Sequence, residues 1–425
     1  MMMNNEYNNL KKISIIEAYE HLFDDAVFWE NIKDFMNEMY ARSVSMYFSA
    51  SKFVSYSMYN VPLTKMEIGS GLSEFSILPR TLTKLVLRRG IYESLNGLPD
   101  SLTCLVIGCA GWNMMIKPGT LPPRLKKLVV SNAFDQPIAA NTFPPTLECV
   151  QFGKYFNQPL DNLPTSVTKL SLGDRYRYPI GNKHLVSFHH KGNAKFTSGV
   201  IFNALTHLKV QNSRCYWDTI TSSAFPSLIK LNLSVPEQWT DPIDFSSLPA
   251  SLEALTIDPN GPVSAIPQGL KKLYVVGSMF PITNSIQLPP SLHSLAMRDC
   301  QTDLMDAGRF PSTLTSLTIT MVMQVPHLYQ LPPSLRSLCL QMEMDTLDNS
   351  TIDRLEEILA ATSLVEISLF FEHPRGAFNH HLHRITHTLF ITQPGNTILE
   401  APNDYGFISA DTIMSMIKVH LIANP

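Results

Sequence analysis

The chain has 425 residues, of which 44% are hydrophobic and only 16% are charged, and its formal net charge is -3. This balance excludes a protein that binds nucleic acid through its overall charge, so any electrostatic attraction has to come from a local patch. No run of about 18 consecutive apolar residues occurs, so the sequence gives no support to a membrane-spanning segment. The six cysteines lack a paired CxxC spacing and the N-terminus lacks the apolar run of a signal peptide, which favours a cytoplasmic location.

The first 60 residues differ in pattern from the rest of the chain and are predicted to form a helical cap. From Ser14 the run SIIEAYEHLF carries a capping box with Glu17, and the next run, DDAVFWENIKDFMNEMYA, has apolar residues at helical spacing. Repeat arrays need such end elements, so two short helices are expected over the first repeat. An alternative is that FDDAVFWENIKDF, residues 23–35, resembles the tail of an F-box, although the leading Leu-Pro and first helix of that domain are absent. That resemblance implies docking to a ubiquitin-ligase adaptor and a role in substrate recognition.

Residues 61–372 repeat one pattern, mostly at steps of 18–24 residues. Clear copies are LPRTLTKLVL from Leu78, LPPRLKKLVV from Leu121 and LPPSLRSLCL from Leu331. The alternation L-x-L is typical of a strand that is too short to be stable alone, so each copy is expected to stack beside the next with its leucines inside. The preceding proline disfavours a helix. The pattern predicts a mostly β, right-handed, leucine-rich-repeat-like solenoid of about 14 rungs, with extended or 3₁₀ segments opposite the strands.

Two segments of the array are expected to be irregular, residues 173–200 and 341–361. In the first, LVSF at Leu185 to Phe188 is interpreted as a degenerate rung, because the step across it is close to two periods. In the second, STIDRLEEILAAT carries a capping-box pattern and leucines at helical spacing, which predicts an inserted helix.

Residues 373–425 are predicted to close the array with a hairpin and a helix. Two apolar runs flank Pro394-Gly395-Asn396, which favours a hairpin turn there, and DTIMSMIKVHLI favours a helix. The same region holds a cluster of histidines, interpreted as a solvated or capping-loop cluster: His373, His380, His381, His383 and His387. A metal site is the alternative, but it needs three or four converging donors, so no metal and no cofactor are expected.

A second motif precedes some of the leucine-rich strands. It reads FDQPI at Phe134 to Ile138, FNQPL at Phe156 to Leu160, and in decayed form YRYPI at Tyr176 to Ile180 and WTDPI at Trp239 to Ile243. With these boxes, residues 61–369 resemble the FNIP repeat family, whose units carry a Phe-Asn-x-Pro-[Ile/Leu] box before the strand. The resemblance implies a leucine-rich-repeat-like superhelix that binds other proteins and is not an enzyme.

The candidate binding residues stand just before the first leucine of each strand. Side chains alternate along a strand, so this position projects away from the leucine core. The residues concerned are Lys65, Lys84, Lys127, Lys169, His207, Lys230 and Lys272. The hypothesis is a basic stripe that binds an acidic segment of a protein partner. The alternative is that lysine keeps an exposed sheet soluble and discourages edge association.

Arg175 and Arg177, in the irregular segment, form a second candidate contact region. Nucleic acid is a weaker hypothesis for either region, because no aromatic stacking set accompanies the lysines. The sequence contains no GxSxG, HExxH or GxxxxGK[ST] motif, so catalysis is not expected. A monomeric protein-binding scaffold is the function that the sequence favours.

Overall fold

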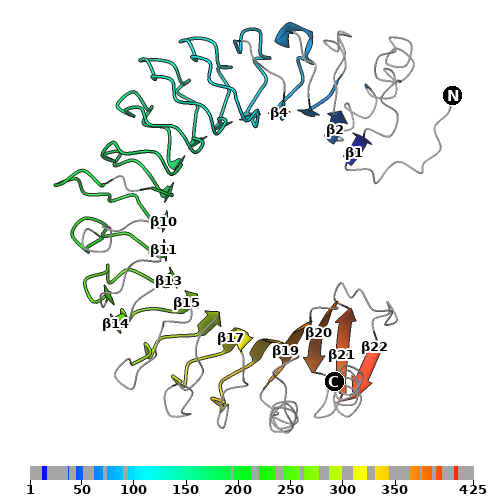
Figure 1. Ribbon diagram of the computed structural model, residues 1–425, viewed down its shortest axis with the longest axis vertical. Coiled ribbons are helices and arrows are strands. Elements are labelled where there is room, and N and C mark those ends of the chain that lie inside the picture. The colour runs from blue at the N-terminus through cyan, green and yellow to red at the C-terminus, as the bar shows by residue number, and fades with distance from the viewer. Residues whose placement is uncertain are drawn as a thin grey trace, which may run out of the picture. The chain divides into compact units, whose positions relative to one another are not determined.

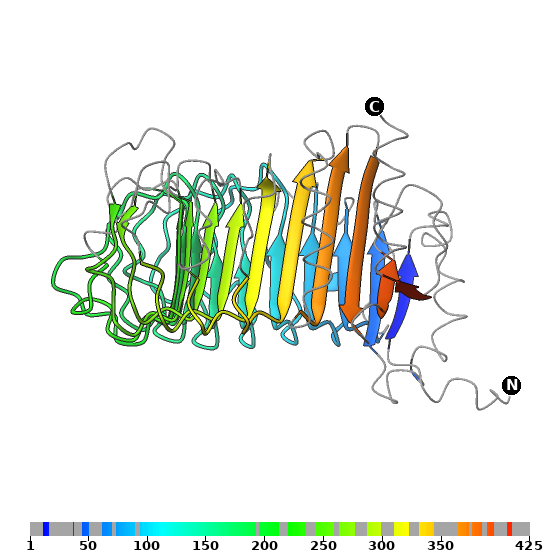
Figure 2. The same cartoon turned by 90° about the horizontal axis from the view of Figure 1, so that it is seen from below.

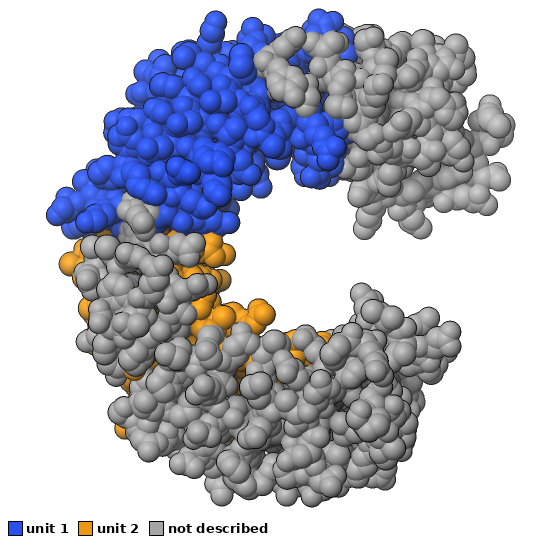
Figure 3. Space-filling view, viewed as in Figure 1, with its two compact units in different colours: residues 1–205 blue, residues 206–425 orange. Residues whose placement is uncertain are grey.

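The structure is a computed structural model, and it divides into two compact units, residues 1–205 and 206–425 (Figure 3). It describes residues 12–16, 37, 45–50, 62–69, 74–89, 94–192, 195–211, 220–234, 243–258, 263–276, 287–298, 310–322, 331–343, 364–373, 376–384, 389–394 and 406–409.

Unit 1 is a stack of short parallel strands, each paired with the next along the chain (Figures 1 and 2). The strands are β1 (Lys12–Ile16), β2 (Ser45–Ala50), β3 (Lys65–Ile68), β4 (Lys84–Leu87), β5 (Cys104–Ile107), β6 (Lys127–Val129), β7 (Cys149–Gln151), β8 (Lys169–Leu172) and β9 (Ser187–His190). A 3₁₀ helix, η3 (Phe75–Ile77), lies in the return segment between β3 and β4. The predicted mostly β solenoid of parallel strands is therefore confirmed.

Unit 2 continues the same plan and ends in antiparallel strands. Its parallel strands pair in the order β10 (His207–Gln211), β11 (Lys230–Ser234), β13 (Ala254–Asp258), β15 (Lys272–Val276), β16 (Ser294–Arg298), β17 (Ser316–Val322), β18 (Ser337–Glu343) and β19 (Glu366–His373). The antiparallel strands are β20 (Gly376–Arg384), β21 (Leu389–Pro394) and β22 (Gly406–Ser409). A small second sheet pairs β12 (Ile243–Asp244) with β14 (Val263–Ala265).

Where Ser or Thr precedes the leucine, the proline-leucine motif folds the rung through two hydrogen bonds. The proline carbonyl accepts the N–H of the leucine three residues later, as from Leu102 to Pro99 at 3.1 Å, which closes a turn before the strand. The hydroxyl that precedes this leucine donates to a backbone carbonyl of the previous rung, as from Ser101 Oγ to the Leu82 oxygen at 2.7 Å. Ser166, Ser251, Thr313 and Ser334 donate in the same way. The motif thus encodes both the turn and the stacking of one rung on the next.

A ladder of parallel aromatic rings fills the core of unit 1 opposite the strands. The ring centroids of Trp112 and Phe134 are 5.5 Å apart, those of Phe134 and Phe156 are 5.9 Å apart, and those of Phe156 and Tyr176 are 6.0 Å apart. The planes differ by at most 12°, and all four side chains are buried. Three of these residues are the aromatic positions of the FDQPI, FNQPL and YRYPI boxes, so the boxes build a continuous stack.

Each of the first three rings is followed by an Asn or Asp residue, and the side-chain oxygens of these residues form a ladder of hydrogen bonds from rung to rung. Asn113 Oδ1 accepts the backbone N–H of Asp135 at 2.8 Å, and Asp135 Oδ1 accepts that of Asn157 at 2.8 Å. Asn157 Oδ1 in turn accepts the backbone N–H of Arg177 at 2.9 Å. An arginine side chain has no acceptor, so the ladder ends there. These bonds satisfy backbone donors that no strand partner reaches in the return segments.

His190 packs against the aromatic rings of unit 1 and makes the stability of this unit depend on pH. The side chain is fully buried, edge-on to Tyr176 at 6.3 Å and stacked on Phe188 at 6.0 Å. Burial lowers the pKa of His190 from 6.5 to about 4, and the nearby charges of Arg177 and His189 lower it as well. A hydrogen bond with the Leu172 backbone has the opposite effect on this pKa, smaller than that of burial.

Between these two pKa values the unfolded chain binds a proton that the folded chain does not. The free energy of unfolding is therefore expected to fall as the pH drops from about 6.5 to about 4. Above about pH 6.5 His190 is neutral in both states, so its titration no longer changes the free energy of unfolding. Urea midpoints at pH 7.5 and pH 5, measured for the wild type and for His190→Phe, isolate the contribution. A smaller loss at pH 5 in the variant is expected, whereas equal losses in the two proteins would contradict it.

The predicted helical N-terminal cap is wrong at its start. Residues 12–16 form strand β1, which pairs in parallel with β2, and β2 pairs with β3, so strands extend the stack beyond the first predicted rung. Among the described residues only Asn37, within the run DDAVFWENIKDFMNEMYA, is α-helical, and the residues on either side of it lie outside the described part of the chain. The sequence KISII alternates and is rich in β-branched residues, and this strand preference overrides the capping box at Ser14. The F-box-like segment, residues 23–35, lies outside the described residues and stays a prediction.

The C-terminal cap is also corrected. The loop expected around His380, His381 and His383 is instead strand β20, which pairs antiparallel with β19 and β21. The strand that leads into Pro394-Gly395-Asn396 is confirmed as β21, which pairs antiparallel with β22, with Leu389 opposite Ser409. The second apolar run of the predicted hairpin, residues 397–402, lies outside the described residues. The predicted helices at 350–362 and 411–422 and His387 lie outside the described residues. The degenerate rung at Leu185–Phe188 provides β9, in register with β8.

Candidate functional site

The strand face is the side of each sheet from which side chains project away from the leucine core. In unit 1 its first column contains the residues at the start of strands β3 to β9, which stand opposite one another in the register of the sheet: Lys65, Lys84, Cys104, Lys127, Cys149, Lys169 and Ser187. Lys84, Lys127 and Lys169 are exposed, whereas Lys65 is half-buried. The predicted lysine column is therefore a real alignment in space.

The lysines of this column have no ion-pair partner among the residues that the structure describes, while their neighbours do. Lys126 pairs with Glu148 at 3.0 Å, and Arg88, just after β4, pairs with Glu67 of β3. Lys84, Lys127 and Lys169 join no such pair within the described ranges. Three exposed cations thus lie in one line on the strand face.

The second column of the strand face starts with Glu67 on β3 and is apolar on the next three strands. Val86, Val106 and Val129 stand opposite one another on β4, β5 and β6, and each is half-buried. They form a partly exposed apolar strip one step from the lysine column. This strip was not predicted from the sequence, although the residue between the two strand leucines was a readable signal.

Unit 2 carries a shorter version of the first column. His207, Lys230, Ala254, Lys272 and Ser294 stand opposite one another, and Lys230 and Lys272 are exposed. The next positions are Ser316 and Ser337, so the cations are confined to the first strands of the unit. Lys271, beside Lys272, pairs with Glu253 at 2.7 Å, which repeats the contrast between paired and unpaired lysines seen in unit 1.

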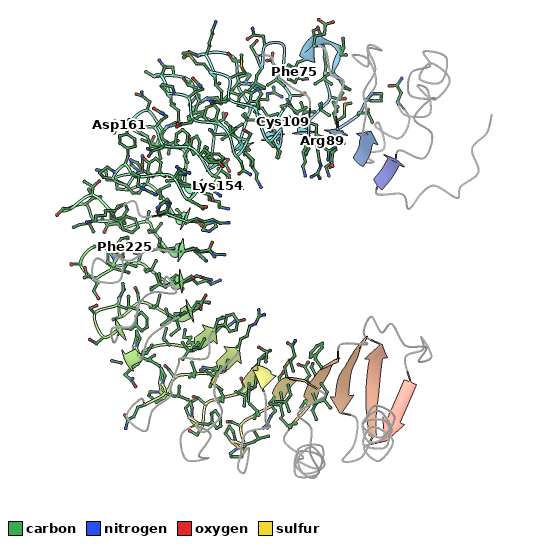
Figure 4. All side chains as sticks on the ribbon, in the orientation of Figure 1. Phe75, Arg89, Cys109, Lys154, Asp161 and Phe225 are labelled. Atoms are coloured by element: carbon green, nitrogen blue, oxygen red, sulfur yellow. The ribbon has the colours of Figure 1, made fainter. Side chains whose placement is uncertain are left out.

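Arg175 and Arg177 do not join the lysine column. They lie beyond the end of β8, whereas Lys169 starts it. Arg175 lies 5.5 Å from the centroid of the exposed Tyr155 ring, and Lys154 lies 5.9 Å from the same centroid. Arg177 Nη1 donates to the carbonyl oxygens of Asp174 at 2.7 Å and Tyr176 at 3.0 Å, so its guanidinium serves its own loop. Figure 4 places Lys154 near the inner edge of unit 1 and Asp161 at the opposite, outer edge.

Cys104, which stands between Lys84 and Lys127 in the column, carries a protonated thiol. Burial raises the pKa of the Cys104 thiol, and the opposing effect of Lys127 and Lys84 is smaller. A thiol with a raised pKa stays protonated at neutral pH, and the thiol form is a poor nucleophile. Within the described residues, no group of three or more His, Cys, Asp and Glu side chains could hold a metal ion. No helix in that part of the chain is long and apolar enough to cross a membrane.

Comparison with known families gives a match to residues 112–155, by the model described as FNIP Repeat. The chain contains an FNIP repeat. The matched segment begins at Trp112, the first ring of the aromatic ladder, and contains the FDQPI box. An additional FNIP box, WNMMI at residues 112–116, was missed from the sequence because Trp and Met replace the usual Phe and Pro. Its 22-residue distance from Phe134, equal to that from Phe134 to Phe156, was the available signal.

Two solved structures are similar to this FNIP repeat protein. One is CroV588, described as a novel circular LRR protein, with 22% sequence identity and a TM-score of 0.47 over 70% of this chain and 53% of that chain. The other is an internalin, inlF, from Listeria monocytogenes str. 4b F2365, with 18% identity and a TM-score of 0.41 over 72% of this chain and 93% of that chain. The matched part therefore spans about half the length of CroV588. No curated protein sequence matches the chain.

Proposed function

We propose that this protein is a non-enzymatic interaction scaffold that binds an acidic segment of a protein partner on the strand face of unit 1. The observation that carries the proposal is the line of exposed lysines Lys84, Lys127 and Lys169, which lack ion-pair partners in the described part of the chain. Cations aligned across a sheet repel one another, so such a line is unfavourable for folding alone. A partner carboxylate beside each lysine removes that repulsion.

The neighbouring side chains support a peptide rather than a small anion. The valine strip at Val86, Val106 and Val129 offers apolar contact beside the charges, and a protein segment presents both kinds of side chain. The strands that carry these residues already pair with a neighbouring strand on each side, so no strand edge is open to the partner. The partner therefore binds through side chains and not by adding a strand.

Reversing two of these charges tests the proposal. Lys127→Glu with Lys169→Glu is expected to weaken binding of a fluorescent twelve-residue poly-glutamate peptide by about tenfold or more, since each exposed contact contributes about 0.5–1 kcal/mol and each reversal adds repulsion. Fluorescence anisotropy at low and at physiological salt measures the change.

The matched control reverses two exposed lysines of unit 1 that stand outside the column, Lys117→Glu with Lys183→Glu. It changes the net charge by the same amount and is expected to weaken binding far less. Equal losses in the two variants would show that only net charge attracts the peptide. Unchanged binding in the first variant would remove the proposal.

A further inference from the structure

The exposed lysines of the strand face occupy every second strand, and the half-buried Lys65 stands beside Lys84 on the strand before them. In unit 1 the register position reads Lys84, Cys104, Lys127, Cys149 and Lys169 on consecutive strands. In unit 2 it reads Lys230, Ala254 and Lys272, again with a small neutral residue between the cations. Neighbouring strands are about 4.8 Å apart, so successive lysines start about 9.6 Å from one another. The strand register therefore fixes a regular spacing of positive charge.

This spacing selects among the conformations that a bound segment can adopt. A polyproline II helix rises about 3.1 Å per residue with three residues per turn, so every third side chain lies on one face at about 9.3 Å. In a β-strand the side chains of one face are about 6.6 Å apart. In an α-helix, residues seven apart are about 10.5 Å apart, so the mismatch grows to about 1.8 Å over two steps. The polyproline II mismatch over two steps is only about 0.6 Å.

The rest of the surface fits the same conformation. A polyproline II helix leaves its backbone solvated and makes no internal hydrogen bonds, so it needs no free strand edge. It presents three rows of side chains. With one row over Lys84, Lys127 and Lys169, a second row lies toward the adjacent strip of Val86 and Val106, which favours an apolar residue in each turn.

We propose that the segment bound by unit 1 is a polyproline II helix with a carboxylate at every third residue. Three carboxylates at positions 1, 4 and 7 span about 19 Å, the distance from Lys84 to Lys169 across four strand steps. The partner class is thus an acidic, proline-rich protein segment rather than any acidic chain. This inference rests on the proposed function.

Two peptides of equal composition test the spacing. One is Asp-Pro-Pro repeated three times, and the other is Asp-Pro-Asp-Pro-Asp-Pro-Pro-Pro-Pro, which keeps the charge and the polyproline conformation but places the carboxylates at every second residue. Isothermal titration with the full chain is expected to give about tenfold tighter binding of the first peptide, because the second aligns only one carboxylate with a lysine.

A variant that moves one lysine supplies the matched control. The double variant Cys104→Lys with Lys127→Cys exchanges two residues that occupy the same register position on neighbouring strands, so the net charge is unchanged. It makes the spacing between successive lysines unequal. The preference for the period-three peptide is expected to disappear in this variant, while the circular dichroism spectrum and the melting temperature confirm that it folds.

The outcomes separate the two proposals. Equal binding of both peptides to the wild type, lost in Lys127→Glu with Lys169→Glu, would overturn the polyproline inference and leave the proposed function standing. Binding of poly-glutamate without binding of either proline peptide would do the same. Binding of all three that ignores Lys127 and Lys169 would overturn the proposed function itself.

Discussion

Replacing Gly153 with alanine is expected to destabilise unit 1 by about 3 kcal/mol or more, at or above the upper end of the range for overpacked cores. A Cβ atom built on Gly153 overlaps the carbonyl oxygen of Ser131 and the Cα atom of Asn132 in the previous rung. Both are backbone atoms, so no side-chain rotation relieves the overlap. Gly173 stands in the same relation to the Gly153 carbonyl, so the rungs stack backbone on backbone at these positions.

Gly111→Ala is the matched control, because nothing lies within 4 Å of a Cβ atom at that position. There the substitution only restricts the unfolded chain, so a neutral or slightly stabilising effect is expected. Urea unfolding followed by circular dichroism gives both free energies. A Gly153→Ala variant as stable as the wild type would mean that the rungs can separate at no cost, and that the close stacking is not required.

The register of the sheets was the part of the fold most fully predictable from the sequence. The two strand leucines repeat with little variation, and a one-residue slip would turn them toward solvent. The column from Lys65 to Lys272 is therefore correctly aligned within each unit by the amino-acid sequence alone. The parallel pairing has the same origin, since each copy of the repeat runs in the same direction.

The contacts between rungs could not be predicted from one copy of the repeat. Ser101 and Ser166 bind carbonyl groups of the previous rung, and Asn113 and Asp135 bind N–H groups of the next one. Each partner lies about one repeat away in sequence, so these polar positions look like ordinary turn residues until the rungs are stacked. The first strand was missed because a capping-box pattern outweighed the β-branched residues around Ser14.

The sequence predicted which residues belong to the candidate site, but it did not predict which of them form ion pairs. The sequence places Lys127 and Lys169 in one column, but which lysines lack partners depends on the strands beside them. Lys126 and Lys127 are neighbours in the chain, yet only Lys126 meets a glutamate. Arg175 and Arg177 resemble the column residues in charge, whereas the structure holds them beyond the end of the strands.

Phe156→Ala is expected to cost unit 1 about 3–5 kcal/mol, the usual loss for removing a buried phenylalanine. The ring is fully buried and lies between Phe134 and Tyr176 in the ladder, with the Phe152 ring only 3.9 Å from its centroid. Its removal breaks the stack on both sides, and in a repeat protein each rung is stabilised mainly by its two neighbours.

The adjacent Tyr155→Ala is the control, because this ring is 47% exposed and lies beside the cations Lys154 and Arg175. Its loss is expected to cost about 1 kcal/mol or less. Denaturant unfolding of the two variants, one residue apart, compares a ring inside the ladder with a ring on the surface. If both lost the same free energy, the aromatic ladder would contribute no more than surface contacts, and the box residues would have to be explained by their hydrogen bonds alone.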